Sequence, residues 1–153
     1  MAVEVYGVVI ADIDTEFGDY PARSASTRPT STQVTARITT VAGEVNEYLD
    51  QAGFTTAQVT ADDDAQEWVK RSIVLGVSAW VARSLRGAAQ TRSDSLLQQY
   101  QDRLSRLVNN PAILGTIYSA AGDSYGTRTH NVLYPASGRL AKFHYASTRD
   151  QIH

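Results

Sequence analysis

The sequence contains no cysteine, which excludes disulfide bonds, thiol nucleophiles and zinc sites with cysteine ligands. It also has no apolar run near the ~18 residues that a membrane-spanning helix needs. Its first residues, Met1–Val5, lack the positively charged segment that begins a secretory signal peptide. We therefore expect a protein that is made in the cytoplasm and contacts no membrane.

The composition is that of a folded globular chain. Of the 153 residues, 42% are hydrophobic and 20% are charged, which is close to the average for globular domains. A chain of this length buries roughly 70% of the surface that its unfolded form exposes, so it can fold stably without disulfide bonds. We expect one domain-sized unit.

Charge is distributed unevenly along the chain, although the net charge is only −2. Residues 1–64 hold three Lys or Arg and eleven acids, residues 65–108 hold seven and three, and residues 109–153 hold four and two. Salt bridges within the chain would explain this pattern. So would an acidic face and a basic face that pack head-to-tail against copies of the same chain.

Apolar periodicity predicts a first long helix over residues 31–52. Thr30 and Gln33 have the spacing of a capping box, and Gly53 is a suitable stop. The apolar stripe of this helix consists of Val34, Ile38, Val41, Val45 and Tyr48.

Two more helices are predicted after a connector at residues 54–62. One begins at Asp62 and ends near Arg86, and its middle is apolar nearly all round, as in a helix covered on several sides. The other is capped by Thr91 or Ser93 and ends before Pro111. Its stripe is Leu97, Tyr100, Leu104 and Leu107.

These patterns predict a mainly α protein, a small antiparallel bundle of three helices over residues 31–110. Residues 1–30 form an N-terminal arm and loop: a β-branched strand or extended arm at 3–10, one helical turn closed by Gly18, and a loop with Pro21 and Pro29. Residues 111–153 form a long C-terminal arm.

The C-terminal arm has no helical stripe. Residues 131–134 and 140–145 are strand-like and flank the turn residues 135–138, which predicts a β-hairpin. The arm is too apolar for a solvated linker. It either packs on a partner or forms an annex on its own bundle.

One pattern in this arm suggests catalysis. Gly122-x-Ser124-x-Gly126 matches the nucleophile elbow of hydrolases, and Asp150 and His153 follow in the order of a triad. The residues after the elbow do not suggest a helix, however, and the chain has no βαβ units. We therefore expect a Gly-rich turn and a protein that is not an enzyme.

No metal or cofactor is predicted. Asp12-x-Asp14-x-Glu16 begins like a calcium loop, but Phe17 occupies the position that needs glycine and Arg23 the position that needs glutamate. None of the histidines has ligand spacing: His130, His144 and His153.

Several side chains are candidates for contacts with other proteins. Trp80 is expected to fill the core, whereas Trp68, near the start of its helix, is a candidate interface anchor. Arg83 and Arg86 are candidates near the end of the same helix. The C-terminal arm adds five aromatic candidates: Tyr118, Tyr125, Tyr134, Phe143 and Tyr145.

The order of motifs is informative. An acidic turn ending in Phe-Gly, residues 14–18, precedes a Ser/Thr/Pro-rich loop, residues 26–31, and then the long first helix, which ends in EVNEYL (residues 44–49) before a glycine. A helix rich in Ala and Trp and a helix with Leu and Tyr follow. Over about residues 8–110 this order resembles the head–tail adaptor (head-completion) proteins of long-tailed bacteriophages and phage-like particles.

The resemblance implies a structural connector subunit in the neck of the virion, made in the host cytoplasm. It implies a ring of copies, usually twelve, that joins the portal protein to a stopper or tail-terminator protein. Ring neighbours would pair acidic and basic faces, the C-terminal arm would reach the portal or a neighbour, and DNA would pass through the lumen without being read. No cofactor is implied.

Two alternatives remain. Another neck or tail-completion protein would tend to be β-rich. A small helical regulatory or DNA-binding module is the second alternative, but the basic residues are dispersed over two helices and the isoelectric point is about 5.9.

Overall fold

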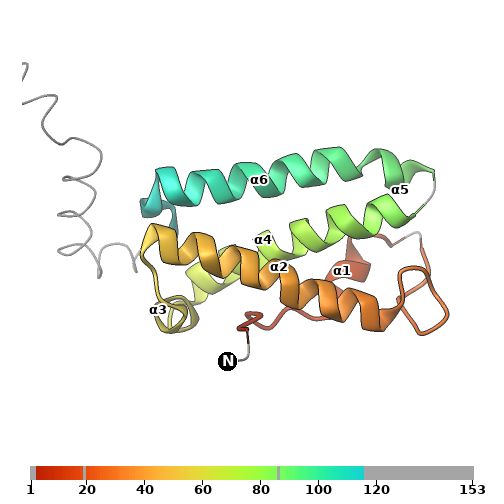
Figure 1. Ribbon diagram of the computed structural model, residues 1–153, viewed down its shortest axis with the longest axis horizontal. Helices are drawn as coiled ribbons and strands as arrows, with labels where there is room; N and C mark the ends of the chain where they lie inside the picture. Colours follow the sequence, from red (N-terminus) through yellow and green to blue (C-terminus); the bar gives the residue numbers. More distant parts are fainter. Residues whose placement is uncertain (1–2, 19, 86, 116–153) are drawn as a thin grey trace, which may run out of the picture. The chain divides into compact units, whose positions relative to one another are not determined.

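Three long helices form the body of the protein: α2 (Ser31–Ala52), α4 (Asp63–Ser84) and α6 (Ser93–Asn109) (Figure 1). The computed structural model describes residues 3–18, 20–85 and 87–115. Over these residues the protein is mainly helical, as predicted, with shorter helices α1 (Ile10–Thr15), α3 (Thr56–Thr60) and α5 (Ala88–Thr91) and the 3₁₀ helix η1 (Pro111–Leu114).

Helix α2 has the caps that its sequence predicts. The Thr30 side chain accepts a hydrogen bond from the backbone N–H of Gln33, and the Gln33 side chain accepts one from the backbone N–H of Thr30. Gly53 ends the helix in the left-handed conformation, with φ of 79°. The stripe is buried from Val34 to Leu49, whereas Tyr48 is only partly buried.

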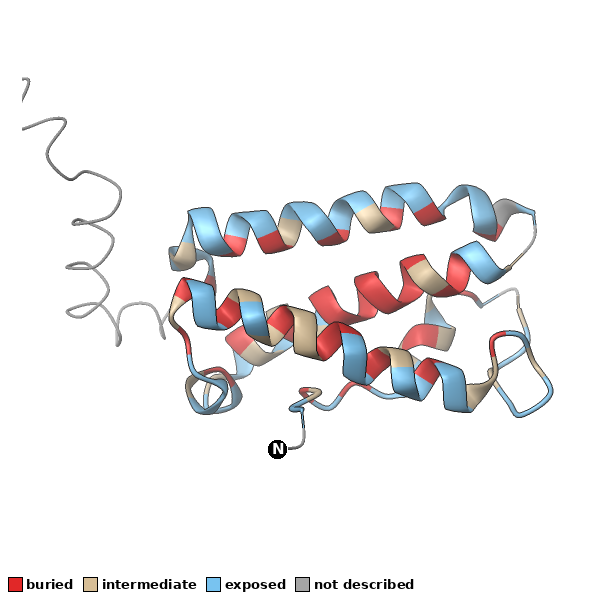
Figure 2. Ribbon diagram, viewed as in Figure 1, coloured by how far each residue is buried: buried red, intermediate tan, exposed pale blue. Residues whose placement is uncertain are grey.

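Helix α4 is the central helix, and its residues 72–79 are all buried (Figure 2). It contacts α2, α6, α1 and α3, which explains why its middle is apolar on all sides. Gly76 lies at the closest approach. A Cβ atom at this position would lie 2.8 Å from Val41 Cγ1 and 3.0 Å from Tyr100 Cε2.

Helix α6 begins differently from the prediction. Neither Thr91 nor Ser93 caps it, because α5 precedes it directly and Arg92, in helical conformation, takes the N-cap position without a side-chain cap. The buried stripe starts at Leu96, and Leu97 is only partly buried. The helix ends before Pro111, as predicted.

Residues 3–10 were predicted to form a strand or an extended arm, and the strand alternative was wrong. The backbone turns at Tyr6 and Gly7, both with positive φ (52° and 71°), and α1 begins at Ile10. The apolar side chains pack on the bundle instead of pairing with a strand: Tyr6 is 1% exposed and Val8 is 5% exposed. The N-terminal segment is therefore part of the hydrophobic core.

The connector at residues 54–62 contains a helix that the sequence analysis missed. Thr55 and Gln58 form a capping box at the start of α3, with the spacing that was recognised at Thr30. The capping-box spacing was present in the sequence, but a five-residue helix is too short to show the apolar periodicity by which the long helices were predicted.

The predicted β-hairpin and the rest of the C-terminal arm beyond Gly115 lie outside the described residues.

Candidate interaction surfaces

Internal ion pairs account for part of the charge segregation. Asp12 Oδ1 of α1 lies 3.2 Å from Lys70 Nζ of α4, and Glu16 accepts a hydrogen bond from Arg71 of α4. Asp14 Oδ1 lies 3.1 Å from Arg23 Nε. The acidic N-terminal segment is therefore bound to the basic side of α4, as expected for salt bridges within the chain.

Other charges remain without an internal partner. Residues 38–69 contain seven acids and no Lys or Arg. Five of these acids are exposed and form no ion pair within the described part of the chain: Glu47, Asp50, Asp63, Asp64 and Glu67.

Three arginines lie near one another where α4 packs against α6, and we call them the arginine cluster: Arg71, Arg103 and Arg106. Arg103 is held in place, because its Nε donates to Ser72 Oγ (2.9 Å) and its Nη2 donates to the carbonyl oxygen of Trp68 (2.8 Å). Its Cζ also lies 4.3 Å from the centre of the Trp68 ring, a cation–π arrangement.

Charge accumulates in this cluster. Partial burial lowers the pKa of Arg103, and the positive charges of Arg71 and Arg106 lower it further. Glu16 pairs with Arg71, whereas no carboxylate pairs with Arg103 or Arg106 among the described residues. The cluster therefore presents excess positive charge, and an oxyanion would relieve the repulsion within it.

A groove of about 580 Å³ lies along the contact between α2 and α6, and we call it the α2/α6 groove. Its lining combines carboxylates with tyrosine rings and leucines: Arg37, Glu44, Glu47, Tyr48, Gly76, Leu97, Tyr100, Gln101, Leu104 and Ser105. Tyr100 donates its hydroxyl hydrogen to Glu44 Oε2 (3.1 Å), and Arg37 Nη2 lies 3.9 Å from Glu44 Oε1.

The buried tyrosines make stability sensitive to alkaline pH. Burial raises the pKa of Tyr100 well above its usual value of 10, and the Glu44 carboxylate raises it further. Burial also raises the pKa of Tyr6. Above pH 10 the folded state then binds more protons than the unfolded state, so the free energy of unfolding falls as pH rises.

We expect the Tyr100→Phe substitution to reduce this alkaline loss by up to about 1.4 kcal/mol for each pH unit above 10. Urea unfolding of both proteins at pH 8, 10 and 11 measures the difference. The same slope in both proteins would contradict the assignment.

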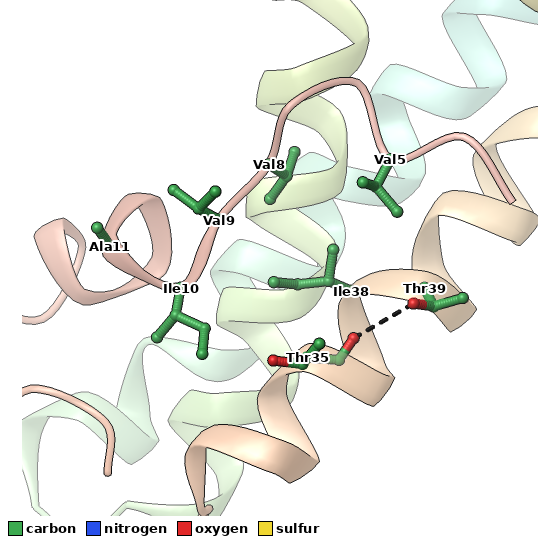
Figure 3. Close-up of a pocket in the computed structure, with 8 residues that line it drawn as sticks. All are labelled: Val5, Val8, Val9, Ile10, Ala11, Thr35, Ile38 and Thr39. Carbon is green, nitrogen blue, oxygen red and sulfur yellow. Dashed lines mark hydrogen bonds between the residues drawn. The ribbon is translucent and has the colours of Figure 1, made fainter.

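A second groove is almost entirely aliphatic (Figure 3). The N-terminal segment and α2 enclose about 460 Å³ between Val5, Val8, Val9, Ile10 and Ala11 on one side and Thr35, Ile38 and Thr39 on the other. Val9 is 54% exposed. An open aliphatic surface of this kind suits a protein contact.

The predicted contact residues have different surroundings. Trp68 is partly buried against the core, and Arg103 lies over its ring; whether it anchors an interface stays a prediction. Trp80, expected in the core, is only partly buried. Arg83 is exposed and lies 3.7 Å from Asp94 Oδ1. Arg86 and the five aromatic candidates of the C-terminal arm lie outside the described residues: Tyr118, Tyr125, Tyr134, Phe143 and Tyr145.

Sequence reasoning did not identify Arg103 or Glu44 as contact residues, and it placed Tyr100 only in the apolar stripe of its helix. The sequence gives the position of each residue on its helix. It does not give their partners, which depend on how α6 is aligned with α2 and α4.

Residues 3–18, 20–85 and 87–115 contain no group of three or more His, Asp or Glu side chains placed to hold a metal ion. Within the same ranges, every helix is too short or too polar to cross a membrane.

The chain matches no protein-family model, no curated protein and no solved structure.

Proposed function

We propose that this protein is a structural subunit of a phage head–tail connector, which forms a ring between the portal and the tail and lets DNA pass. The observation that carries the proposal is the order of elements. An acidic α1 and the Phe17-Gly18 turn precede the Ser/Thr/Pro-rich loop, a 22-residue α2 that ends at Gly53, and then α4 and α6. This is the order on which the resemblance to head–tail adaptors is based.

The surfaces also support the proposal. A ring subunit needs contacts on more than one side. The aliphatic groove, the α2/α6 groove and the arginine cluster involve different residues. In this proposal the C-terminal arm, with its predicted β-hairpin, reaches the portal or a neighbouring subunit.

The first test of the proposal is the identity of the neighbouring genes. We expect portal and capsid genes just upstream, and the portal protein encoded there should bind this protein when both are produced together. DNA-filled capsids that lack this protein should fail to join tails, and the purified protein should restore joining. Normal joining in its absence would contradict the proposal.

The arginine cluster favours a second candidate, a small DNA-binding module. A gel shift with random duplex DNA at physiological salt tests it. Retention of the DNA would favour the module, whereas a connector subunit that only lets DNA pass has no reason to retain it.

A further inference from the structure

The internal ion pairs leave two oppositely charged surfaces on one molecule. Asp12 on α1 and Glu16, which follows α1 directly, are paired with Lys70 and Arg71. Glu47 on α2 and Arg106 on α6 are exposed, and neither forms an ion pair among the described residues. Asp102, four residues before Arg106, does not pair with it either. Each surface has the charge that the other lacks.

The α2/α6 groove suits an arginine side chain. Leucines and tyrosine rings would contact the aliphatic stem and the flat guanidinium, and the carboxylates of Glu44 and Glu47 would accept its hydrogen bonds. Arg37 also lines the groove, two helical turns before Glu44, and partly neutralises that carboxylate. Glu47 forms no ion pair among the described residues.

The arginine cluster suits the opposite role. Trp68 and Ser72 hold Arg103 in one position, so little side-chain entropy remains to be lost on binding. Arg106, one helical turn further along α6, is exposed. The repulsion between the arginines would be relieved by carboxylates from outside.

The two surfaces have no residue in common. The groove lies between α2 and α6, whereas the cluster lies between α4 and α6 and includes the Arg71 pair with Glu16. A contact between such different surfaces is heterologous, so each copy can bind one neighbour on each side. Repetition of that contact gives a closed ring or a filament.

We propose that the arginine cluster of one copy docks in the α2/α6 groove of the next copy, with Arg106 placed between Glu44 and Glu47. This inference rests on the proposed connector function and identifies the contact between ring neighbours. The partner is a second copy rather than nucleic acid, because the complementary carboxylates are present on the same chain and the net charge of the whole chain is −2.

Charge exchange in the full-length protein tests the contact. Arg106→Glu and Glu47→Arg should each weaken self-association about tenfold or more at low salt, because each places like charges opposite one another. The double variant should restore it. Sedimentation velocity over a concentration series measures the effect, Arg83→Glu is the matched control at another exposed arginine, and circular dichroism checks that each variant is folded.

Cysteine pairs provide a second measurement that detects weak association. The chain has no cysteine, so a Glu47→Cys/Arg106→Cys double variant can form disulfides only at the introduced positions. We expect a ladder of dimers, trimers and larger species under mild oxidation. Either single variant should stop at dimers, and a Glu47→Cys/Arg83→Cys pair should give no ladder.

A missing ladder, or a charge exchange that does not restore association, overturns the inference. Retention of random duplex DNA that Arg106→Glu abolishes, without any self-association, also overturns it and assigns the cluster to nucleic acid. The joining of capsids to tails is measured in a separate experiment. Capsids that join tails normally with both charge-reversed single variants would remove this contact and leave the connector function intact, whereas a ladder without tail joining would remove the connector function alone.

Discussion

Gly76→Val is expected to lower the free energy of unfolding by about 3 kcal/mol, because overpacking a close helix contact typically costs about 1–3 kcal/mol and valine adds three carbons here. The first of them would lie 2.8 Å from Val41 Cγ1 and 3.0 Å from Tyr100 Cε2. Val41 is completely buried and Tyr100 is 6% exposed, so neither side chain can move aside easily. Both helices that contact α4 at this point would have to move outward.

Urea unfolding measures the loss. For a small protein with a slope near 2 kcal/mol per molar urea, the midpoint should fall by about 1.5 M with little change in slope. The α2/α6 groove includes Gly76, so the same variant should also weaken self-association if the docking proposal is correct.

Gly43→Ala is the matched control. Gly43 lies inside α2, and a Cβ atom there would have no neighbour within 4 Å. Alanine in a helix interior is favoured over glycine by about 1 kcal/mol, so this variant should be more stable than the original protein. A stable Gly76→Val variant would mean that α2, α4 and α6 are not packed as closely as described.

Tyr6→Ala is expected to cost about 3–5 kcal/mol, the range measured for removal of buried aromatic rings. The Tyr6 side chain is 1% exposed, and its hydroxyl donates to Asn46 Oδ1 on α2. This loss is a large part of the total stability of a small domain, about 5–15 kcal/mol. We expect the variant to be partly unfolded at 37 °C.

Two substitutions separate the contributions. Tyr6→Phe keeps the ring and loses one hydrogen bond, so it should cost about 1 kcal/mol. Val9→Ala, three residues away and 54% exposed, should change stability by less than about 0.5 kcal/mol. Thermal unfolding followed by circular dichroism ranks the three variants. If Tyr6→Ala were as stable as Val9→Ala, the N-terminal segment would not contribute to the stability of the helical bundle.

Local signals predicted the long helices well. The capping pairs Thr30 with Gln33 and Asp62 with Ala65 involve atoms within three residues of one another, so the sequence contains all the information that they need. The same is true of Gly53 and Pro111 at the helix ends. Periodicity also identified α4 as the covered helix, because its middle has no polar side to present to water.

The errors arose where distant residues decide the conformation. The β-branched run at residues 3–10 has the composition of a strand, but no other strand is available among the described residues, and α2 offers a surface that buries Tyr6 and Val8. The start of α6 is similar. Local preference favoured a cap at Thr91 or Ser93, whereas Ser93 is buried.

The sequence by itself determined the helices, their caps and the uneven distribution of charge, since these depend on residue types and on short spacings along the chain. Only the tertiary structure decided which charges are paired. Asp12 and Lys70 are 58 positions apart, and Arg103 is 35 positions from the Trp68 carbonyl to which it donates a hydrogen bond. Coulomb and hydrogen-bond energies depend on distance in space and not on distance along the chain. The packing of α6 on α4 therefore fixes the Arg103 side chain against Trp68 and Ser72, whereas it leaves Arg106 exposed.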